Sequence, residues 1–422
     1  MLDSKFIRDH AAAVKRNCLR RNANVDVDAF LRMDEERRNL IQAVEGMRAE
    51  RNAVADSMKS VDASGRSALI ERGKSLKESI AAKETALSDI ERSWKDFLYR
   101  IPNMTHPDVP EGASDEENVE IRTVGTVGKI KDPLNHVQIA EKHDLIDFSR
   151  GAKVAGAKFY FLKGKLMLLE QALVRFALDR LVREGFTPMT TPDVAKDEIL
   201  IGTGFMPRGH ETQMYSLENS DLSLIGTAEI PLGGYHAGEI LDESALPLLY
   251  AGLSHCFRTE AGAYGRESYG LYRVHQFTKV EMFAYAAPDQ SDALLERMQH
   301  TSEDLFTELG IPFRVVEICT GDFGNPHYRK YDIEAWMWGK GDGKGGWGEV
   351  TSASNCSDYQ ARRLQIRMRR KDGSVEMVHT LNNTAIATSR ALIVLLENHQ
   401  NEDGSVTVPD ALVPFCGFDR IG

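Results

Sequence analysis

The chain has 422 residues, which is enough for two domains that each bury a core of their own. Its formal net charge is -11, which argues against nonspecific nucleic-acid binding over the whole surface but leaves room for a local basic patch. The five cysteines are scattered and form no C-x-x-C pair, so we expect reduced cytosolic thiols and no zinc site.

The N-terminus does not have the pattern of a secretory signal, because Asp3, Lys5 and Arg8 interrupt its apolar residues. No run in the chain approaches the roughly 18 apolar residues that a membrane span requires. We therefore expect a cytoplasmic protein with no membrane partner.

Two long stretches carry apolar or long-stemmed residues at spacings that alternate between three and four, the pattern of a coiled coil. The first runs from Phe30 to Met58 and the second from Leu69 to Ile101. Between them, residues 61–66 (VDASGR) are typical of a turn. The pattern predicts an antiparallel α-helical hairpin. With about 30 residues per helix, this coiled-coil arm extends about 45 Å.

The purpose of such an arm is open from its pattern alone. A dimerisation or spacer coiled coil is the general alternative. The distal part, Met47 to Glu78, carries seven lysines and arginines against five acidic residues. A mildly basic tip on an acidic protein suits contact with phosphate at one place.

A linker follows the arm, because residues 101–112 (IPNMTHPDVPEG) contain three prolines and a glycine. Beyond it the chain mixes an amphipathic helix at 166–186 with β-rich runs at 246–260, 271–285 and 312–322. Strands with long connections and few β-α repeats predict an α+β fold with an antiparallel sheet and flanking helices.

The segment 257–283 (FRTEAGAYGRESYGLYRVHQFTKVEMF) is a candidate binding surface. If 271–285 is a strand, Arg273, Phe277 and Glu281 share one face, while the other face has the apolar residues to bury. Arginines grip phosphate, a phenyl ring supports a base and a carboxylate holds an ammonium group. Such a face could hold a nucleotide beside an amino acid. The alternative is a solvated strand face with cross-strand salt bridges. The glycine-containing loop at 261–270 receives no role.

Two later segments have the same character. Glu349 stands near the hydroxyls of Thr351 and Ser352, a set that suits Mg²⁺ carried by a nucleotide, although a polar strand end is the alternative. The segment 382–400 is expected to be a helix capped at its first residues and apolar almost all round. Arg390 inside it needs a partner, either an internal carboxylate or a ligand phosphate.

Familiar nucleotide-binding loops are not found. Residues 341–346 (GDGKGG) satisfy G-x-G-x-x-G, but a strand-like run follows where a helix is required, so we interpret them as a loop. No P-loop motif occurs.

Together these motifs closely resemble the seryl-tRNA synthetases, a family of class II aminoacyl-tRNA synthetases. The three class signatures resemble 159–192, the F-R-x-E and R-x-H-Q-F-x-K-x-E pair in 257–281, and the helix with Arg390. TAEIPL from Thr227 and EVTSASNCSDYQARR from Glu349 resemble the serine branch. The chain departs from many bacterial members in having Asn-Asn-Thr-Ala from residue 382 in place of N-G-S-G, although Thr384 keeps a hydroxyl.

The resemblance implies a role for each matching residue. Catalytic roles fall to Arg258, Glu281 and Arg390. ATP binding falls to Arg258, Thr259, Glu260, Val274, Phe277, Glu349, Val350, Thr351, Ser352 and Arg390, with Phe277 stacked on adenine. Serine binding falls to Thr227, Ala228, Glu229, Glu281 and Thr384. Glu349 and Ser352 would hold Mg²⁺ with ATP.

The resemblance also implies how the chain is organised. Residues 1–101 would form a tRNA-binding domain with its arm at about 28–100, 102–115 a linker, and 116–422 a catalytic and dimerisation domain. The implied partners are ATP, L-serine, tRNA(Ser) and a second copy in a homodimer, with service to tRNA(Sec) left open. The rivals are an enzyme that charges a carrier protein, and an inactive paralogue that acts as an RNA-binding or interaction protein.

Overall fold

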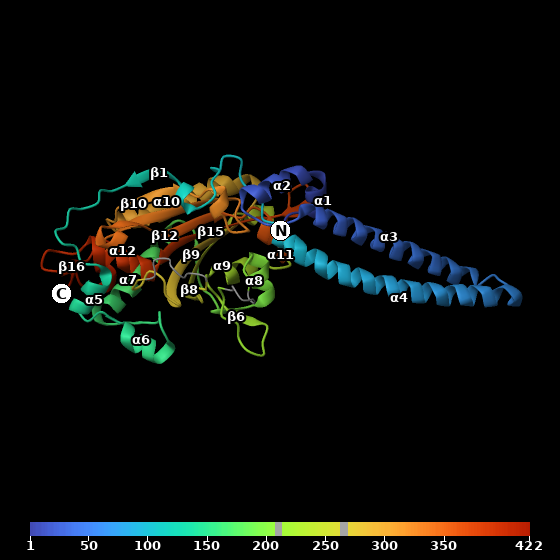
Figure 1. Ribbon diagram of the computed structural model, residues 1–422, viewed down its shortest axis with the longest axis horizontal. Coiled ribbons are helices and arrows are strands. Elements are labelled where there is room, and N and C mark those ends of the chain that lie inside the picture. The colour runs from blue at the N-terminus through green and yellow to red at the C-terminus, as the bar shows by residue number, and fades with distance from the viewer. Residues whose placement is uncertain (207–212, 262–268) are drawn as a thin grey trace. The chain divides into compact units, whose positions relative to one another are not determined.

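The computed structural model describes residues 1–206, 213–261 and 269–422 and divides the chain into two compact units, Met1–Met104 and Thr105–Gly422 (Figure 1). We describe each unit by itself.

The first unit is helical and consists of four helices: α1 (Ser4–Asp9), α2 (Ala11–Arg20), α3 (Val27–Ser57) and α4 (Ala63–Arg100). Residues of α1 and α2 pack against the beginning of α3 and the end of α4 in one apolar cluster, in which Ile7, Phe30 and Ile101 are fully buried. This cluster forms a globular base from which the rest of α3 and α4 runs out.

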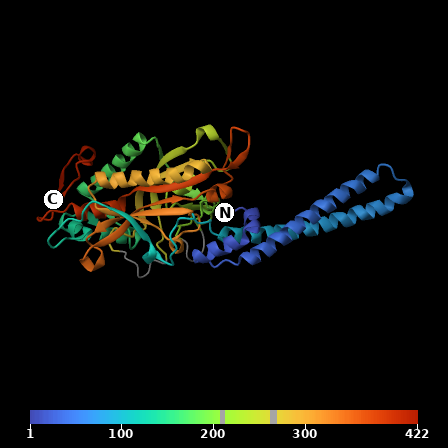
Figure 2. The same ribbon diagram turned by 90° about the horizontal axis from the view of Figure 1, so that it is seen from above.

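The predicted arm is confirmed. Helices α3 and α4 lie side by side along their length and run in opposite directions (Figures 1 and 2). Val44, Leu76 and Ile80, all at predicted seam positions, are buried although solvent surrounds the hairpin. The seam therefore holds the two helices together by apolar burial.

The predicted turn at residues 61–66 is wrong from Ala63 onward. The side chain of Asp62 accepts a hydrogen bond from the backbone N–H of Gly65 at 3.0 Å, and its carbonyl accepts one from Arg66. Asp62 therefore caps helix α4, which begins at Ala63. The residues that connect the helices are 58–62.

The second unit is built on an eight-stranded sheet with the order β1-β10-β11-β12-β15-β9-β8-β4, in which each neighbouring pair is antiparallel except β4 and β8. Its strands are β1 (Val119–Val124), β4 (Thr187–Thr190), β8 (Leu248–Phe257), β9 (Gln276–Ala286), β10 (Phe313–Glu317), β11 (Arg329–Met337), β12 (Gly346–Asn355) and β15 (His379–Ala387). The α+β class and the antiparallel sheet are as predicted.

Helices and short strands complete the unit. The helices are α5 (His136–Lys142), α6 (Phe148–Ala155), α7 (Gly164–Arg183), α8 (Asp197–Thr203), α9 (Glu229–Gly234), α10 (Ser291–Glu308), α11 (Tyr359–Leu364), α12 (Thr388–Asn398) and α13 (Val413–Cys416). The short strands are β2 (Ile146–Asp147), β3 (Phe161–Leu162), β5 (Val194–Lys196), β6 (Leu222–Leu224), β7 (Ile240–Asp242), β13 (Arg367–Arg369), β14 (Val375–Met377), β16 (Val406–Thr407) and β17 (Arg420–Ile421).

The alternation along β9 separates the two faces of the sheet. Val280, Met282 and Ala284 join the main core with apolar residues of α7, α10 and α12. Phe283 and Tyr285 point to the opposite face, where they pack with residues of α9 and α11 in a second cluster. Phe277, Lys279 and Glu281 share that opposite face by the same alternation, so the predicted separation of apolar and polar positions holds.

The predicted strand 271–285 begins only at Gln276, and β8 ends at Phe257. Arg258, Glu260 and Arg273 therefore lie beyond the ladder of paired residues rather than on a flat strand face. Glu260 has a left-handed backbone with φ of 51°, which turns the chain away from the strand direction.

The expected helix at 382–400 is wrong over its first six residues, which belong to strand β15, and α12 begins at Thr388. β15 lies between β12 and β9 and is covered on both faces. The side chain of Asn382 bonds to Glu229, and that of Asn383 bonds to the carbonyl of Met298 on α10. A strand buried on both faces has no polar–apolar alternation for a sequence reading to detect.

Two smaller expectations concern the cysteines and the membrane. All five cysteines are free thiols. Among the residues that the structure describes, none of the helices has the length and apolar character needed to cross a bilayer.

Candidate active site

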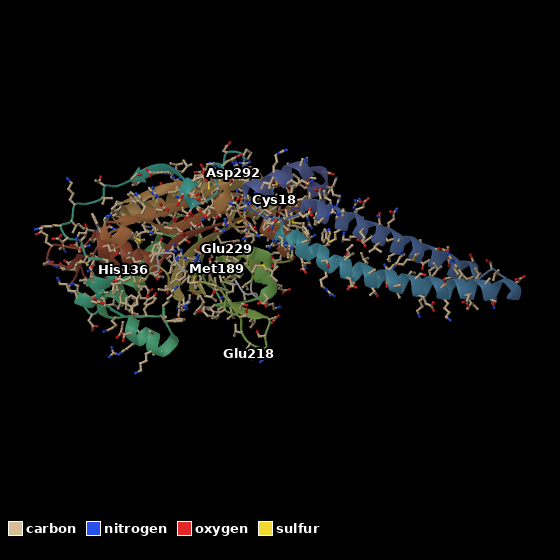
Figure 3. The ribbon with its side chains drawn as sticks, in the orientation of Figure 1. Cys18, His136, Met189, Glu218, Glu229 and Asp292 are labelled. Carbon is tan, nitrogen blue, oxygen red and sulfur yellow. The ribbon has the colours of Figure 1, made fainter. Side chains whose placement is uncertain are left out.

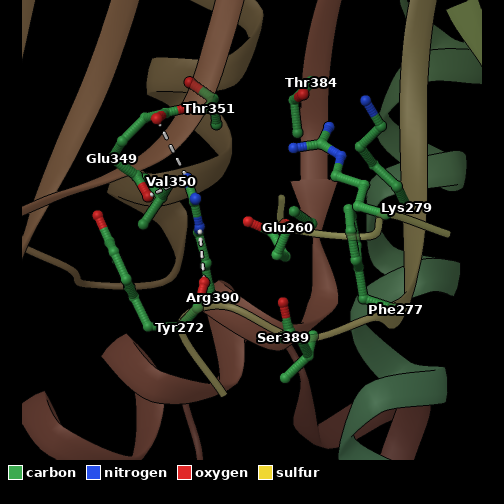
Figure 4. A pocket seen from close by; sticks show the side chains of 13 residues that line it. Glu260, Tyr272, Phe277, Lys279, Glu349, Val350, Thr351, Thr384, Ser389 and Arg390 are labelled. Carbon is green, nitrogen blue, oxygen red and sulfur yellow. Dashed lines mark hydrogen bonds and ion pairs between the residues drawn. The ribbon is translucent and has the colours of Figure 1, made fainter. Parts of the chain in front are cut away.

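A pocket opens on the sheet face to which Phe277 points, where β9, β12 and β15 meet the beginning of α12 (Figure 4). It encloses about 450 Å³ of space, part of it open to solvent. Its lining consists of Arg258, Glu260, Tyr272, Val274, Phe277, Lys279, Glu349, Val350, Thr351, Thr384, Ala387, Ser389 and Arg390.

One wall of the pocket is formed by Arg258 and Phe277. Arg258 follows the last residue of β8, and its guanidinium carbon lies 5.3 Å from the centre of the Phe277 ring. Its Nε donates to the carbonyl of Gly226 at 3.3 Å. A cation held against an aromatic face provides both a contact for phosphate or carboxylate and a surface on which a flat base can stack.

The opposite wall is formed by Arg390, Glu349 and Tyr272, and Figure 4 shows their side chains together. The Arg390 Nη1 donates to the carbonyl of Glu349 at 2.9 Å and lies 3.3 Å from its Oε2. The guanidinium lies 4.7 Å from the centre of the Tyr272 ring, and its Nε donates to the Tyr272 carbonyl at 3.4 Å. The internal carboxylate that the sequence left as one possible partner of Arg390 is thus Glu349.

The charge state of Glu349 follows from its neighbours. Burial alone would raise its pKa, but Arg390, Lys330 and Arg258 outweigh burial and hold the pKa at about 2. The Glu349 carboxylate is therefore ionised at neutral pH and can bind a cation.

A β-bulge places Glu349 and Ser352 on one face of β12. Ser352 pairs with Asp332 and Glu349 with Glu334, so Val350 is the extra residue on the bulged strand. In a regular strand, residues three apart point to opposite faces. Burial, together with the Glu349 charge and against the opposing effect of Lys330, raises the pKa of Asp332 to about 6.

A second group of polar residues lies deeper, on β9 and its neighbours. Lys279 and Glu281 form a buried ion pair. Lys279 Nζ donates to Thr227 Oγ1 at 2.7 Å, and Thr384 Oγ1 donates to Glu281 Oε2 at 3.3 Å. Both Lys279 and Thr384 reach the pocket, so the pair is connected to its floor.

Glu229 lies behind this pair in α9, where Figure 3 labels it. Its Oε1 accepts from Gln360 Nε2 at 2.7 Å and from Asn382 Nδ2 at 3.1 Å. Burial, together with the nearby charge of Glu281, raises the pKa of Glu229 to about 7. Near neutral pH this carboxyl group is therefore partly protonated.

The structure brings most of the sequence-predicted site residues together, since nine of them line the pocket: Arg258, Glu260, Val274, Phe277, Glu349, Val350, Thr351, Thr384 and Arg390. The others lie outside its lining. Thr227, Glu229 and Glu281 stand behind it in the buried network, and Ala228 is part of the cluster around α9. Ser352 faces Asp332, and the Thr259 N–H donates to Gln213 at 3.0 Å.

Sequence reasoning did not name four lining residues as site residues: Tyr272, Lys279, Ala387 and Ser389. Lys279 had a detectable signal, because it shares the strand face of Phe277 and Glu281. Tyr272 had no such signal, because it precedes the first residue of β9 and its contact with Arg390 depends on how the chain folds. Residues 262–268, in the loop for which the sequence suggests no role, lie outside the described residues.

Comparison with known proteins identifies the class first. The family model of the tRNA synthetase class II core domain (G, H, P, S and T) matches residues 214–399, which contain the pocket. The fold is that of a class II aminoacyl-tRNA synthetase. Residues 1–105 match the seryl-tRNA synthetase N-terminal domain.

Relatives that match the whole length of the chain identify the family within this class. The serine–tRNA ligases of Treponema denticola and Rubrobacter xylanophilus are 52% and 54% identical to this chain over its whole length, and 100% and 99% of those proteins are covered. The crystal structure of seryl-tRNA synthetase from Pyrococcus horikoshii complexed with ATP is 42% identical, with a TM-score of 0.90 and coverage of 100% and 99%. The chain belongs to the seryl-tRNA synthetase family, and serine–tRNA ligation is its activity.

Proposed function

We propose that this pocket binds ATP and L-serine side by side, forms seryl-adenylate and pyrophosphate, and passes the seryl group to the 3′ end of tRNA(Ser). The proposal rests on one observation: the site has two sides of different chemical character. The Arg258, Phe277 and Arg390 side offers cations and an aromatic ring, and the Glu281 and Thr384 side offers a buried carboxylate and a hydroxyl.

On the ATP side, Phe277 stacks on the adenine, while Arg258 contacts the α-phosphate and the serine carboxylate. Arg390 meets the γ-phosphate, and Glu260 lies on the same side of the site. The left-handed turn at Glu260 and its ion pair with Arg273 (Nη1 to Oε2, 3.2 Å) hold that carboxylate at the pocket. The ATP-complexed structure from Pyrococcus horikoshii supports ATP as the nucleotide.

Mg²⁺ accompanies the ATP in this proposal. Among the residues that the structure describes, three or more His, Cys, Asp or Glu side chains nowhere form a cluster that could hold a metal by itself. Mg²⁺ commonly takes one or two protein oxygens and completes its shell with substrate phosphates and water. The ionised Glu349 and the hydroxyl of Ser352, placed on one face by the bulge, fit this arrangement. The ion would neutralise phosphate charge.

On the serine side, Glu281 receives the ammonium group and Thr384 bonds to the serine hydroxyl. Thr227, Ala228 and Glu229 form the wall behind them. Alanine in such a site would leave buried polar groups without partners, which disfavours it strongly. Lys279 already compensates the charge of Glu281, so the arriving ammonium group joins an existing ion pair.

The reaction is in-line attack of the serine carboxylate on the α-phosphorus, with pyrophosphate leaving. Arg258 faces the developing charge, and Arg390 faces the leaving phosphates. No covalent protein nucleophile is required, because the residues act by holding the reactants in line and by stabilising charge.

The N-terminal unit would supply tRNA recognition through the arm, which favours tRNA charging over charging of a carrier protein. We keep residues 1–101 as the tRNA-binding domain, 102–115 as the linker and 116–422 as the catalytic and dimerisation domain. A homodimer is supported by exposed apolar side chains on the consecutive elements α6, β3 and α7, namely Val154, Phe161, Met167, Leu168 and Val182. A cytoplasmic location fits the free thiols.

The test is ATP–pyrophosphate exchange with each of the twenty amino acids in turn. We expect exchange with serine, and its loss in Arg390→Gln. Arg369→Gln, at an exposed arginine of β13, is the matched control and should behave as wild type. Faster exchange with threonine or alanine than with serine would contradict the proposed substrate. Absence of exchange with every amino acid would contradict the proposal and favour the inactive paralogue.

A further inference from the structure

A buried histidine outside the pocket connects three parts of the catalytic unit. His136 is the first residue of α5, and Figure 3 labels it at one end of that unit. Its side chain is 4% exposed and contacts Glu397, near the end of α12, whose side chain has no exposed surface. Neither residue lines the proposed ATP site.

The hydrogen bonds define which ring nitrogen carries the proton. The backbone N–H of Leu271 donates to His136 Nε2 at 3.1 Å, so Nε2 must be the unprotonated acceptor. His136 Nδ1 therefore carries the proton and donates to Glu397 Oε1 at 2.7 Å. The His136 backbone N–H also donates to Oε1, and the Gly339 N–H donates to Oε2, both at 2.9 Å. The imidazole is thus a neutral bridge from a carboxylate to Leu271.

The chain around Leu271 is shaped to meet this imidazole. Gly270 has φ of 58°, and a Cβ built on it would lie 2.0 Å from His136 Nε2. Only glycine combines this backbone conformation with so close an approach. The ring of Tyr269 lies edge-on to the imidazole, with 6.0 Å between ring centres. The end of the loop that precedes β9 is therefore held against α5.

The same segment reaches the pocket one residue later. The carbonyl of Tyr272 accepts from Arg390 Nε, and its ring lies against the Arg390 guanidinium. Arg390 and Glu397 are seven residues apart on α12, two turns along one side of the helix. The segment 270–272 is thus attached to α12 at two points: directly at Arg390, and through His136 at Glu397.

We propose that His136 is a positioning residue that places Tyr272 under Arg390 and so aligns the guanidinium with the triphosphate of ATP. The inference rests on the proposed role of this pocket as the ATP site. It predicts that the contact from Nε2 to Leu271 matters for ATP, whereas the contact from Nδ1 to Glu397 serves mainly to orient the ring.

Two substitutions separate these contacts. His136→Gln places an amide oxygen near the former Nε2 and can still accept from Leu271. His136→Asn places its amide near the former Nδ1 and can still donate to Glu397, but it loses the acceptor for Leu271. We expect H136N to raise the KM for ATP in pyrophosphate exchange about tenfold, the usual effect of losing a buried hydrogen bond. The KM for serine should change little, and H136Q should stay close to wild type.

The control is His399→Asn, which removes a half-buried histidine whose Nε2 contacts the carbonyl of Leu309, the residue just after α10. It should leave the KM for ATP unchanged even if the melting temperature falls. If H136N does not fold, Gly270→Ala is the alternative variant. Its methyl group displaces the segment 270–272 from His136, so we expect the same rise in the KM for ATP.

A double-mutant cycle with Arg390→Gln completes the test. R390Q is expected to lose exchange, so this cycle is measured as the Kd for ATP in direct binding. If His136 acts through Arg390, adding H136N to R390Q has no further effect on that Kd. Equal KM values for H136N and H136Q, or additive effects in the cycle, would overturn the inference. A wild-type protein without serine-dependent exchange would instead overturn the proposed function, so the two failures are distinguishable.

Discussion

Thr384 illustrates how one hydroxyl can decide specificity at the scale of a single residue. Its Oγ1 donates to Glu281 Oε2 inside the buried part of the site, and the side chain reaches the pocket. The contact leaves the hydroxyl oxygen available to accept from a substrate hydroxyl.

Thr384→Val should therefore lower kcat/KM for serine by about tenfold to a hundredfold, since a substrate hydroxyl loses its partner. The value for alanine should fall much less, so the ratio of the two in pyrophosphate exchange is the quantity to measure. Thr301→Val is the matched control, because its hydroxyl donates to the carbonyl of Arg297 within α10. An unchanged ratio would exclude Thr384 as the residue that reads the serine hydroxyl.

Glu229 makes stability depend on pH. Its pKa is raised from 4.5 to about 7, so the folded protein binds a proton more tightly than the unfolded chain does. The stabilisation from this proton is complete below about pH 4.5 and is lost as the pH rises toward 7. The loss is at most about 3 kcal/mol.

Glu229→Gln should flatten this dependence, because the amide is neutral throughout and its oxygen can still accept from Gln360 and Asn382. The measurement is the free energy of unfolding in urea at pH 5 and pH 7.5. The decrease between the two values should be smaller in the variant than in the wild type. An equal decrease would assign the pH dependence to other groups.

At the scale of elements, the bulge at Val350 sets the geometry of the site, and the pair of helices α3 and α4, with the capped start of α4, sets the geometry of the arm. The bulge changes which residues of β12 share a face. The arm depends on two helices that pack against each other through apolar seam residues, and its base is fixed by Asp34, which accepts hydrogen bonds from Arg8 and from Trp94 of α4.

The arm can therefore be shortened without disturbing its base. Replacing residues 41–86 with a short turn keeps the Asp34 contacts and the ion pair of Arg37 with Glu91. We expect serine-dependent pyrophosphate exchange within about twofold of wild type and a loss of tRNA charging of about a hundredfold or more, because phosphate contacts supply much of the affinity for a nucleic acid. Equal loss of both activities would contradict this division of labour.

At the scale of the whole molecule, the exposed apolar side chains of α6, β3 and α7 predict a surface that a second copy of the chain covers. Leu168→Glu should shift the protein from dimer to monomer in light scattering at micromolar concentration, since it puts a charge into an apolar contact. Leu19→Glu is the control, because Leu19 is at least as exposed but lies in α2. A wild-type protein that is monomeric throughout would contradict the homodimer.

Much of this molecule could be predicted from local patterns. The three–four spacing predicted the arm, alternation separated the faces of β9, and motif order indicated the family. Local patterns failed where the structure of a residue depends on contacts with residues that are distant in the sequence. Asn382 to Ala387 looked like the start of a helix because β15 is covered on both faces, and Tyr272 had no periodic signal although it lies against Arg390.

The sequence by itself determined the class of fold, the existence of the arm and most of the residues that line the pocket, because periodicity and motif identity are local properties. Only the tertiary structure decided which charges pair and which faces meet. The bulge puts Glu349 and Ser352 on one face of β12, the buried sheet sets Lys279 against Glu281, and His136 on α5 meets Leu271 across a long separation in the chain. Such contacts depend on how distant strands and helices pack, which no local pattern records.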